Sequence, residues 1–397
     1  MEIKTIVLNK GKEKSLERKH PWLFSGAINR IISDTGEAPE NGELVDVVDF
    51  KNNFLALGHF SDATIAVRII SFKQIEIDQE FWNSKVQSAY NVRTSLGLTE
   101  NASTNIYRLM HAEGDGIPGL IIDFYNGTAI IQAHSIGIYN VINEISNALQ
   151  HVYGKQLIAI YSKSAESLSK QTEEEVVNEY IYKNGEPNLV GLENENQFNL
   201  DWINGQKTGF FLDQRESRKL IADYSKNKKV LNTFCYSGGF SIYALKANAK
   251  EVHSVDSSQK AIDLVDKNVK LNGYKNHKSF TSDTLDYLKE NTIDYDVIIL
   301  DPPAYAKNFK AKHNAIQGYK RLNLMAIKQI KPGGILFTFS CSQVINRKLF
   351  YDTITAAAIE AGRNIRVLNH LSQPADHPVS IYHPEGEYLK GLVLCVE

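Results

Sequence analysis

The sequence contains little cysteine and no long apolar run. The three cysteines, Cys235, Cys341 and Cys395, form neither a disulfide framework nor a C-x-x-C pair, which is typical of a reducing compartment. No apolar run reaches the roughly 20 residues that a membrane span needs. The charged residues 1–14 lack the apolar core of a signal peptide. These absences predict a cytoplasmic protein that does not enter a membrane.

The chain also lacks an excess of either charge. It has 44 lysines and arginines against 46 aspartates and glutamates, for a formal net charge of −2. A basic surface for a nucleic acid must therefore be local. The most basic stretch lies near the N-terminus, where Lys12, Lys14, Arg18 and Lys19 precede Trp22. It is the first candidate for contacts with a polyanion.

Internal repeats and low-complexity segments are absent, and three regions differ in pattern. Residues 1–75 contain short β-branched and aromatic runs between turn residues, which predicts a small β-barrel domain. Residues 76–200 combine a helix at 78–98 and a second at 138–153 with several strands, as in an α+β domain. Residues 201–397 alternate strand and helix, which predicts an α/β domain with a mostly parallel, seven-stranded, doubly wound sheet. No helix separates the last two strands, 365–371 and 388–396, so we expect a reversed hairpin at one edge.

A glycine-containing loop joins the first strand of this sheet to its first helix. Glycines let the backbone approach a ligand closely, and the helix N-terminus offers free N–H donors. The loop is not G-x-G-x-x-G, which disfavours a dinucleotide. A tight strand–helix turn is the alternative interpretation. The loop comprises Phe234, Cys235, Tyr236, Ser237, Gly238, Gly239 and Phe240.

Two carboxylates end the next two predicted strands. An acid at the position of Asp256 binds ribose hydroxyls in nucleotide sites, and Asp283 could accept a hydrogen bond from an adenine amino group. Each alone could equally be a helix cap. Together with the glycine loop they outline a site for an adenosine without a diphosphate, which fits S-adenosylmethionine.

The segment from Asp301 to Tyr305 follows an apolar run and reads Asp-Pro-Pro-Ala-Tyr. Pro302 and Pro303 cannot continue a central strand and they make the loop rigid. A carboxylate held there can bond a ring N–H or an amino group. The ring of Tyr305 can stack on a base, for about 1–3 kcal/mol. The segment therefore predicts a nucleobase site.

Cys341 follows a second apolar run and lies between two serines. Thiolates are strong nucleophiles. Attack on C6 of a pyrimidine would make C5 a carbon nucleophile that accepts a methyl group. The alternative is a small buried hydrophobe, as most free cysteines are. Cys395, within an apolar run, fits that alternative.

Basic residues also lie beside these segments. Residues 205–215 combine Lys207 and an aromatic turn with Asp213 and Arg215; the alternative is a turn into a helix, with caps and a surface ion pair. A basic cluster beside the Asp301 loop could grip RNA or be a solvated helix face. Its members are Lys307, Lys310, Lys312, Lys320 and Arg321.

In order and spacing, these motifs resemble the RlmI-type family of large-subunit ribosomal RNA cytosine-C5 methyltransferases, which carry an N-terminal PUA domain. The resemblance spans essentially the whole chain. Residues 19–24 resemble the start of the PUA domain, and residues 107–120 resemble the central-domain signature. The methyltransferase motifs are matched by residues 205–215, 234–240, 301–307 and 340–342.

This resemblance implies a Rossmann-like class I fold that uses S-adenosylmethionine, with Cys341 as the single catalytic cysteine. Asp301 would bind a cytosine flipped out of the RNA and assist protonation at N3. The implied cofactor contacts are Asp213, Arg215, Phe234, Cys235, Tyr236, Gly238, Gly239, Asp256, Asp283 and Asp301. The implied substrate contacts are Pro302, Pro303, Tyr305, Lys307 and Lys207, and the RNA contacts in the PUA domain are Lys12, Lys14, Arg18, Lys19 and Trp22.

The expected partner is large-subunit ribosomal RNA. We expect no DNA partner, membrane or metal, and a homodimer is left open. One alternative is an RNA methyltransferase that acts on N6 of adenine or N2 of guanine and uses the Asp301 loop without a nucleophilic thiol. Another is an RNA-binding protein without catalytic activity.

Overall fold

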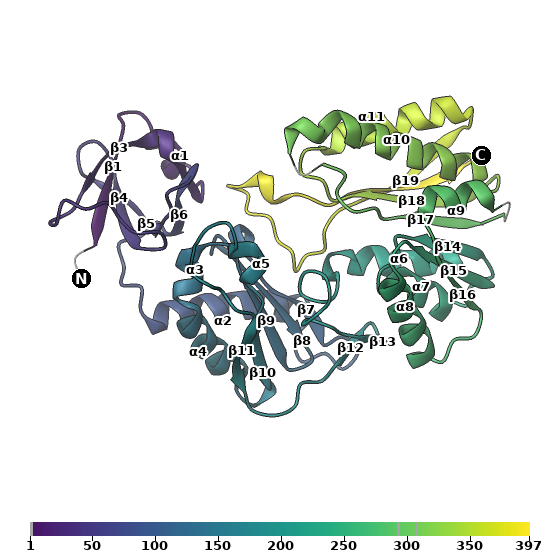
Figure 1. Cartoon of the computed structure of the whole chain (residues 1–397), viewed down its shortest axis with the longest axis horizontal. Helices are drawn as coiled ribbons and strands as arrows, with labels where there is room; N and C mark the ends of the chain where they lie inside the picture. The colour runs from purple at the N-terminus through teal and green to yellow at the C-terminus, as the bar shows by residue number, and fades with distance from the viewer. Residues whose placement is uncertain (1–2, 292–293, 307) are drawn as a thin grey trace. The chain divides into compact units, whose positions relative to one another are not determined.

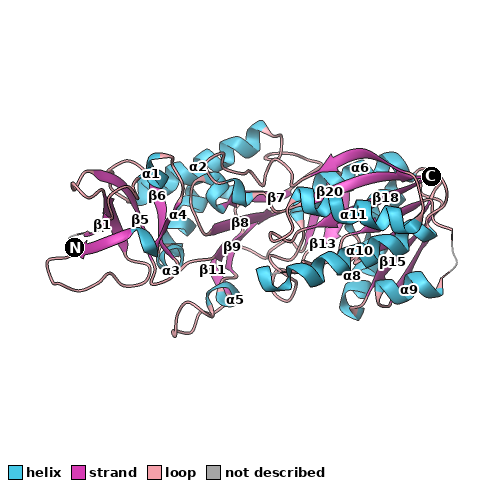
Figure 2. Ribbon diagram, turned by 90° about the horizontal axis from the view of Figure 1, so that it is seen from above, coloured by secondary structure: helices cyan, strands magenta, loops and turns pink. Residues whose placement is uncertain are grey.

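A computed structural model describes residues 3–291, 294–306 and 308–397 (Figures 1 and 2). The chain forms two compact units. The first unit comprises Met1–Leu189, Leu200–Phe210 and Ala375–Gly386. The second unit comprises Val190–Asn199, Phe211–Pro374 and Glu387–Glu397. The division at residues 75 and 200 into three domains stays a prediction.

The N-terminal part of the first unit is a six-stranded sheet in the order β2-β6-β5-β4-β1-β3. Alternate residues of its strands, such as Val45 and Val47, are fully buried, as a strand with one core-facing side requires. The elements are β1 (Lys4–Leu8), α1 (Lys14–Glu17), β2 (Trp22–Phe24), β3 (Ile28–Ile32), β4 (Leu44–Val48), β5 (Phe54–Phe60) and β6 (Ile65–Ser71).

The remainder of the first unit is built on a five-stranded sheet in the order β11-β10-β9-β8-β7. The long helix α2 (Gln79–Ser95) begins where the Asp78 side chain accepts a hydrogen bond from the Phe81 N–H, and it buries Trp82 and Val86. The other elements are β7 (Ile106–His111), β8 (Leu120–Tyr125), β9 (Thr128–Ala133), α3 (Ile136–Asn140), α4 (Ile142–Tyr153), β10 (Ala159–Ser162), α5 (Ala165–Leu168) and β11 (Glu179–Lys183).

The second unit contains the predicted seven-stranded sheet, in the order β16-β15-β14-β17-β18-β20-β19. The first five strands in this order are parallel, and β20 is antiparallel to both neighbours. The predicted reversed pair is therefore present at one edge. The strands are β14 (Lys229–Thr233), β15 (Glu251–Asp256), β16 (His277–Thr281), β17 (Val297–Leu300), β18 (Gly334–Ser340), β19 (Ile365–Leu371) and β20 (Lys390–Val396).

Helices cover both faces of this sheet, with α6, α7 and α8 along one side and α9, α10 and α11 along the other (Figure 1). Parallel strands covered on both faces are apolar throughout, and all four residues of β17 are buried. A hairpin of β12 (Val190–Glu193) and β13 (Asn196–Asn199) packs on α7 and α8. The helices are α6 (Arg215–Ser225), α7 (Gly239–Lys246), α8 (Gln259–Leu271), α9 (Thr284–Glu290), α10 (Lys312–Gln329) and α11 (Arg347–Ala361).

The strand order reverses direction at β14, which lies between β15 and β17. In open α/β sheets, ligands bind beyond the carboxyl ends of the strands at such a switch point. Across residues 3–291, 294–306 and 308–397, we find no helix long and apolar enough to cross a bilayer.

Candidate active site

Asp301 and Cys341 follow directly after the neighbouring parallel strands β17 and β18. Their loops are joined, because the Ser342 hydroxyl donates a hydrogen bond of 2.6 Å to the backbone oxygen of Ala306. Both Asp301 and Cys341 are partly exposed. The structure thus brings together the carboxylate and the thiol that the sequence analysis selected.

The Asp301 carboxyl group is held by the side chain of Gln214, whose Nε2 donates to Oδ2 over 3.0 Å. Burial, together with the nearby charge of Asp213, raises the pKa of Asp301 to about 7. A carboxyl group with this pKa can hold or release a proton at neutral pH, as general acid–base catalysis requires.

This pKa predicts how stability depends on pH. The folded protein holds the Asp301 proton up to about pH 7, whereas the unfolded chain releases it near pH 4. Stability due to this group therefore falls between about pH 4 and pH 7, and the full penalty persists above pH 7. We expect Asp301→Asn to raise the thermal midpoint at pH 8 by more than at pH 5.

Thermal unfolding without cofactor at both pH values measures this effect. Asp286→Asn is the matched control, because Asp286 is exposed and forms an exposed ion pair with Lys289 in α9. An Asp301→Asn variant whose midpoint shift is the same at pH 5 and pH 8 would contradict the prediction.

The thiol of Cys341 is protonated at rest. Burial, followed by the negative charges of Asp301 and Asp213, raises its pKa to about 11, and Lys390 opposes this rise. Attack by this cysteine therefore requires its proton to leave and a nearby positive charge to favour the thiolate.

The glycine loop has an unusual backbone. Phe234 and Tyr236 have φ values of 52° and 43°, in the left-handed region that non-glycine residues rarely adopt. Such residues cluster at binding and active sites. Gly238 also has a positive φ of 75°. At Gly239, a Cβ atom would lie 2.8 Å from Cδ of Arg218, so the loop can only pack this closely with glycine.

The two strand-end carboxylates also have local roles. Asp256 Oδ2 accepts a hydrogen bond from the Tyr236 N–H over 3.1 Å, which fixes the glycine loop. Asp283 caps α9, with Oδ1 accepting from the Leu285 N–H over 2.8 Å. Cys235 is buried, and its pKa is raised mainly by burial. Cofactor contacts by these residues stay predictions.

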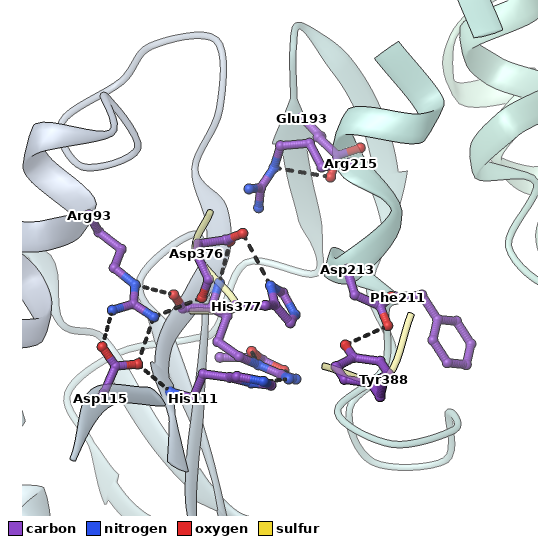
Figure 3. Close-up of polar contacts among 12 residues, drawn as sticks. Arg93, His111, Asp115, Glu193, Phe211, Asp213, Arg215, Asp376, His377 and Tyr388 are labelled. Carbon is purple, nitrogen blue, oxygen red and sulfur yellow. Dashed lines mark hydrogen bonds and ion pairs between the residues drawn. The ribbon is translucent and has the colours of Figure 1, made fainter. Parts of the chain in front are cut away.

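Asp213 and Arg215 lie near the start of α6 and have protein partners (Figure 3). The Tyr388 hydroxyl donates to Asp213 Oδ2 over 2.8 Å. Arg215 is buried, with Nε 3.5 Å from Oε2 of Glu193. The alternative of a surface ion pair is wrong for Arg215, because its partner Glu193 lies in β12 and is fully buried.

Tyr305 packs against α10, with its ring centroid 4.7 Å from that of Tyr319. Pro302 is buried and Pro303 exposed, so only the second proline is accessible to a substrate. Lys307 lies outside the described residues. Lys207 is exposed and belongs to the first unit, whereas Asp301 belongs to the second. A substrate contact by Lys207 stays a prediction.

The basic N-terminal residues are accessible: Lys12, Lys14, Arg18 and Lys19 are exposed. Trp22 is only half-buried, but its indole N–H donates to Glu113 Oε1 over 2.9 Å. These four cations therefore suit phosphate contacts, whereas Trp22 contributes to packing within the first unit.

The central-domain signature also serves packing in the first unit. The guanidinium of Arg93, which is fully buried, donates to both carboxylate oxygens of Asp115 and to the backbone oxygen of Asp376 (Figure 3). Asp115 Oδ2 in turn accepts from the His111 N–H. This network ties the signature to the segment between β19 and β20.

The structure adds residues that sequence reasoning missed. Gln214 holds Asp301, Tyr388 holds Asp213, and Lys390 is the cation that opposes the rise in the pKa of Cys341. No spacing pattern connects these residues, because they come from different elements. A lysine at the start of an otherwise apolar strand was the only available signal for Lys390.

The second unit also offers an unfilled hydrogen-bonding position beside Asp301. Oε1 of Gln214 is buried and, within the described parts of the chain, has no hydrogen-bond partner. An unpaired buried acceptor is costly and invites a donor. An adenosine-type cofactor with amino and hydroxyl groups fits this acceptor and the close backbone of the glycine loop.

Comparisons with known proteins agree with this arrangement. Residues 6–72 match a PUA-like domain, and residues 158–384 match an S-adenosylmethionine-dependent methyltransferase domain. The chain is 40% identical over 399 aligned positions to ribosomal RNA large subunit methyltransferase I of Tolumonas auensis, covering 98% of each chain. It is 38% identical to the protein of the same name from Aeromonas hydrophila, again covering 98% of each.

Two solved structures share the fold across the full length of both chains. A methyltransferase complexed with SAH has a TM-score of 0.84 at 23% identity, and a SAM-dependent methyltransferase structure from Streptococcus mutans has a TM-score of 0.83 at 23% identity. The PUA-like domain and the Rossmann-like fold are confirmed, as is the cofactor class. The chain belongs to the S-adenosylmethionine-dependent methyltransferases, in the family of the ribosomal RNA large subunit methyltransferases I.

Proposed function

We propose that this enzyme methylates C5 of a cytosine in large-subunit ribosomal RNA through a covalent bond between Cys341 and C6. One observation carries the proposal: the Cys341 thiol and the Asp301 carboxyl follow adjacent strands, on loops joined by the Ser342–Ala306 hydrogen bond. The names of the relatives, ribosomal RNA large subunit methyltransferase I, support the RNA substrate.

The proposed reaction begins at the thiol of Cys341. The thiolate of Cys341 attacks C6, and the electrons of the C5–C6 double bond make C5 nucleophilic. S-adenosylmethionine supplies the methyl group that C5 takes. Loss of the C5 proton then restores the double bond and expels the thiolate of Cys341. Nucleophilic catalysis of this kind divides one difficult step into easier ones.

Asp301 would stabilise the negative charge that the ring gains when Cys341 attacks. Its pKa of about 7 means that a proton is available on the carboxyl group at neutral pH. That proton can be shared with N3 of the cytosine as the adduct forms. Tyr305, at the other end of the same loop, would contact the base.

Methylation of an exocyclic amino group, at N6 of adenine or N2 of guanine, is the competing function. A carboxylate and an aromatic ring on the Asp301 loop would suffice for it, and no thiol is required. The proximity of Cys341 to Asp301 favours the C5 reaction, because a nucleophile beside the base has no role in amino-group methylation.

The modified base distinguishes the two reactions. Purified enzyme is incubated with methyl-labelled cofactor and ribosomal RNA that lacks the modification, and the RNA is digested to nucleosides for mass spectrometry. We expect the label in 5-methylcytidine. Label in N6-methyladenosine or N2-methylguanosine would refute the proposal, as would unlabelled RNA in the presence of an enzyme that binds the cofactor.

RNA containing 5-fluorocytidine tests the covalent step separately. Fluorine at C5 cannot leave as a proton, so the adduct to Cys341 should persist after methyl transfer. Mass spectrometry of the digested protein should then locate the nucleotide on the peptide that contains Cys341. An adduct on Cys235, or none, would contradict the assigned nucleophile.

A further inference from the structure

Lys390, the first residue of β20, carries a buried ammonium group. It lies beside the end of β18, the strand that leads to Cys341. Lys390 is 5% exposed and is paired in register with Ser340, the last residue of β18. Its Nζ donates to the backbone oxygens of Ser342 over 2.6 Å and Ile345 over 2.7 Å. The lysine therefore holds both ends of the loop that follows Cys341.

Burying an ammonium group in this position is costly. The two carbonyl oxygens satisfy part of its hydrogen-bonding capacity, and an apolar side chain of similar length would leave both of them without this donor. These hydrogen bonds explain a donor at this position. The positive charge has a second effect, because it favours the thiolate of the neighbouring Cys341.

Several charged groups shift the pKa values of Cys341 and Lys390. Asp301 and Asp213 disfavour the Cys341 thiolate, and Lys390 favours it. Burial first, and then Arg347, lowers the pKa of Lys390 to about 8, while Cys341 and Glu387 raise it. With this pKa, most Lys390 side chains are charged at pH 7. Among the described residues, Lys390 is the cation that acts on the thiol.

We propose that Lys390 is a positioning residue for Cys341, which fixes the loop at residues 341–345 and stabilises the thiolate by its charge. This role rests on the proposed function, in which Cys341 is the nucleophile. It predicts that the reactivity of the thiol depends on Lys390 even when no RNA or cofactor is bound.

Alkylation of Cys341 by iodoacetamide tests the proposal in the full-length protein. Rates are followed from pH 6.5 to pH 10 by peptide mass spectrometry, with Cys395 as the internal reference. In Lys390→Met we expect the pKa of the thiol to rise by about one unit. At pH 7, where most Lys390 side chains of the wild type are charged, this corresponds to about tenfold slower alkylation. Lys390→Arg should retain most of the wild-type rate, because it keeps the charge.

A second variant covers the case in which Lys390→Met does not fold. Glu387 is exposed and raises the pKa of Lys390, so Glu387→Gln should lower the charged fraction of Lys390 near pH 8 and slow alkylation there, with little effect at pH 6.5. Unchanged alkylation in both variants would overturn the proposal. Faster alkylation of Lys390→Met with an unshifted pH curve would also overturn it, since that is the result of a loosened loop alone.

Failure of this inference and failure of the proposed function give different results. If Cys341→Ala still methylates RNA, the nucleophile assignment is wrong, whatever the alkylation data show. If Cys341→Ala is inactive but alkylation does not depend on Lys390, the nucleophile assignment holds and only the role of Lys390 is wrong.

Discussion

Replacing Cys341 with alanine should reduce methyl transfer by at least about 10³-fold, because removal of a covalent nucleophile eliminates the reaction path that depends on it. Cofactor affinity should change little, because Cys341 is not among the proposed cofactor contacts. Methyl transfer from labelled cofactor to RNA, together with isothermal titration with S-adenosylmethionine, measures both quantities.

Cys395→Ala is the matched control for this substitution. It removes a thiol from β20, the same strand that carries Lys390, but its activity should remain near that of the wild type. Cys341→Ser is a second informative variant, because its hydroxyl preserves the size and polarity but is a much weaker nucleophile. Methylation that survives in Cys341→Ala with the fold intact would exclude the covalent mechanism and favour the amino-group reaction.

Replacing Arg218 with methionine should destabilise the second unit by about 3–5 kcal/mol, the cost of breaking a buried ion pair from one side. Nε and Nη2 of Arg218 each donate to Glu193 over 2.7 Å, and Nη1 donates to the backbone oxygen of Phe211 over 2.8 Å. Glu193 is fully buried. The variant would leave this carboxylate buried with too little positive charge beside it.

Hydrogen exchange of the amides in α6 and α7 is the suitable measurement. Tryptophan fluorescence would not report on this change, because all three tryptophans lie in the first unit. The expected faster exchange should be partly reversed by adding Glu193→Gln, which removes the unpaired charge. Lys348→Met, which breaks an exposed pair with Asp352, is the control and should cost less than about 1 kcal/mol.

The Arg218 substitution should also affect the proposed cofactor site. The side chain of Arg218 packs directly beneath Gly239 at the start of α7. Loss of the guanidinium should therefore loosen the glycine loop and weaken binding of S-adenosylmethionine. An Arg218→Met variant with wild-type exchange in α6 and α7 would show that the ion pair contributes little to the fold.

Local patterns in the sequence were sufficient for the seven strands of the α/β sheet and for helices α6 to α11, but they did not predict the β12–β13 hairpin of the second unit. Apolar runs predicted the strands, as in the four buried residues Val297–Leu300. The polar residues after these strands could also be selected, because a parallel sheet places the carboxyl ends of its strands together. Asp301 and Cys341 were found in this way.

The sequence could not show which groups set the protonation of this pair. Gln214, Asp213 and Lys390 come from segments up to 177 positions apart along the chain, and only the fold brings them to Asp301 and Cys341. The capping role of Asp283 and the partner of Arg215 were open for the same reason. Each of these depends on distances between side chains from different elements.

The sequence by itself thus determined the strands and helices of the α/β sheet, their order and the chemistry available at the strand ends, because these depend on the periodicity and type of neighbouring residues. The tertiary structure alone decided that burial and Asp213 raise the pKa of the Asp301 carboxyl to about 7, and that a buried lysine donates to the backbone oxygen of Ser342, the residue after Cys341. The burial of a side chain and the charges around it depend on which elements pack against it. These elements are distant in the sequence, so local patterns do not predict the resulting pKa.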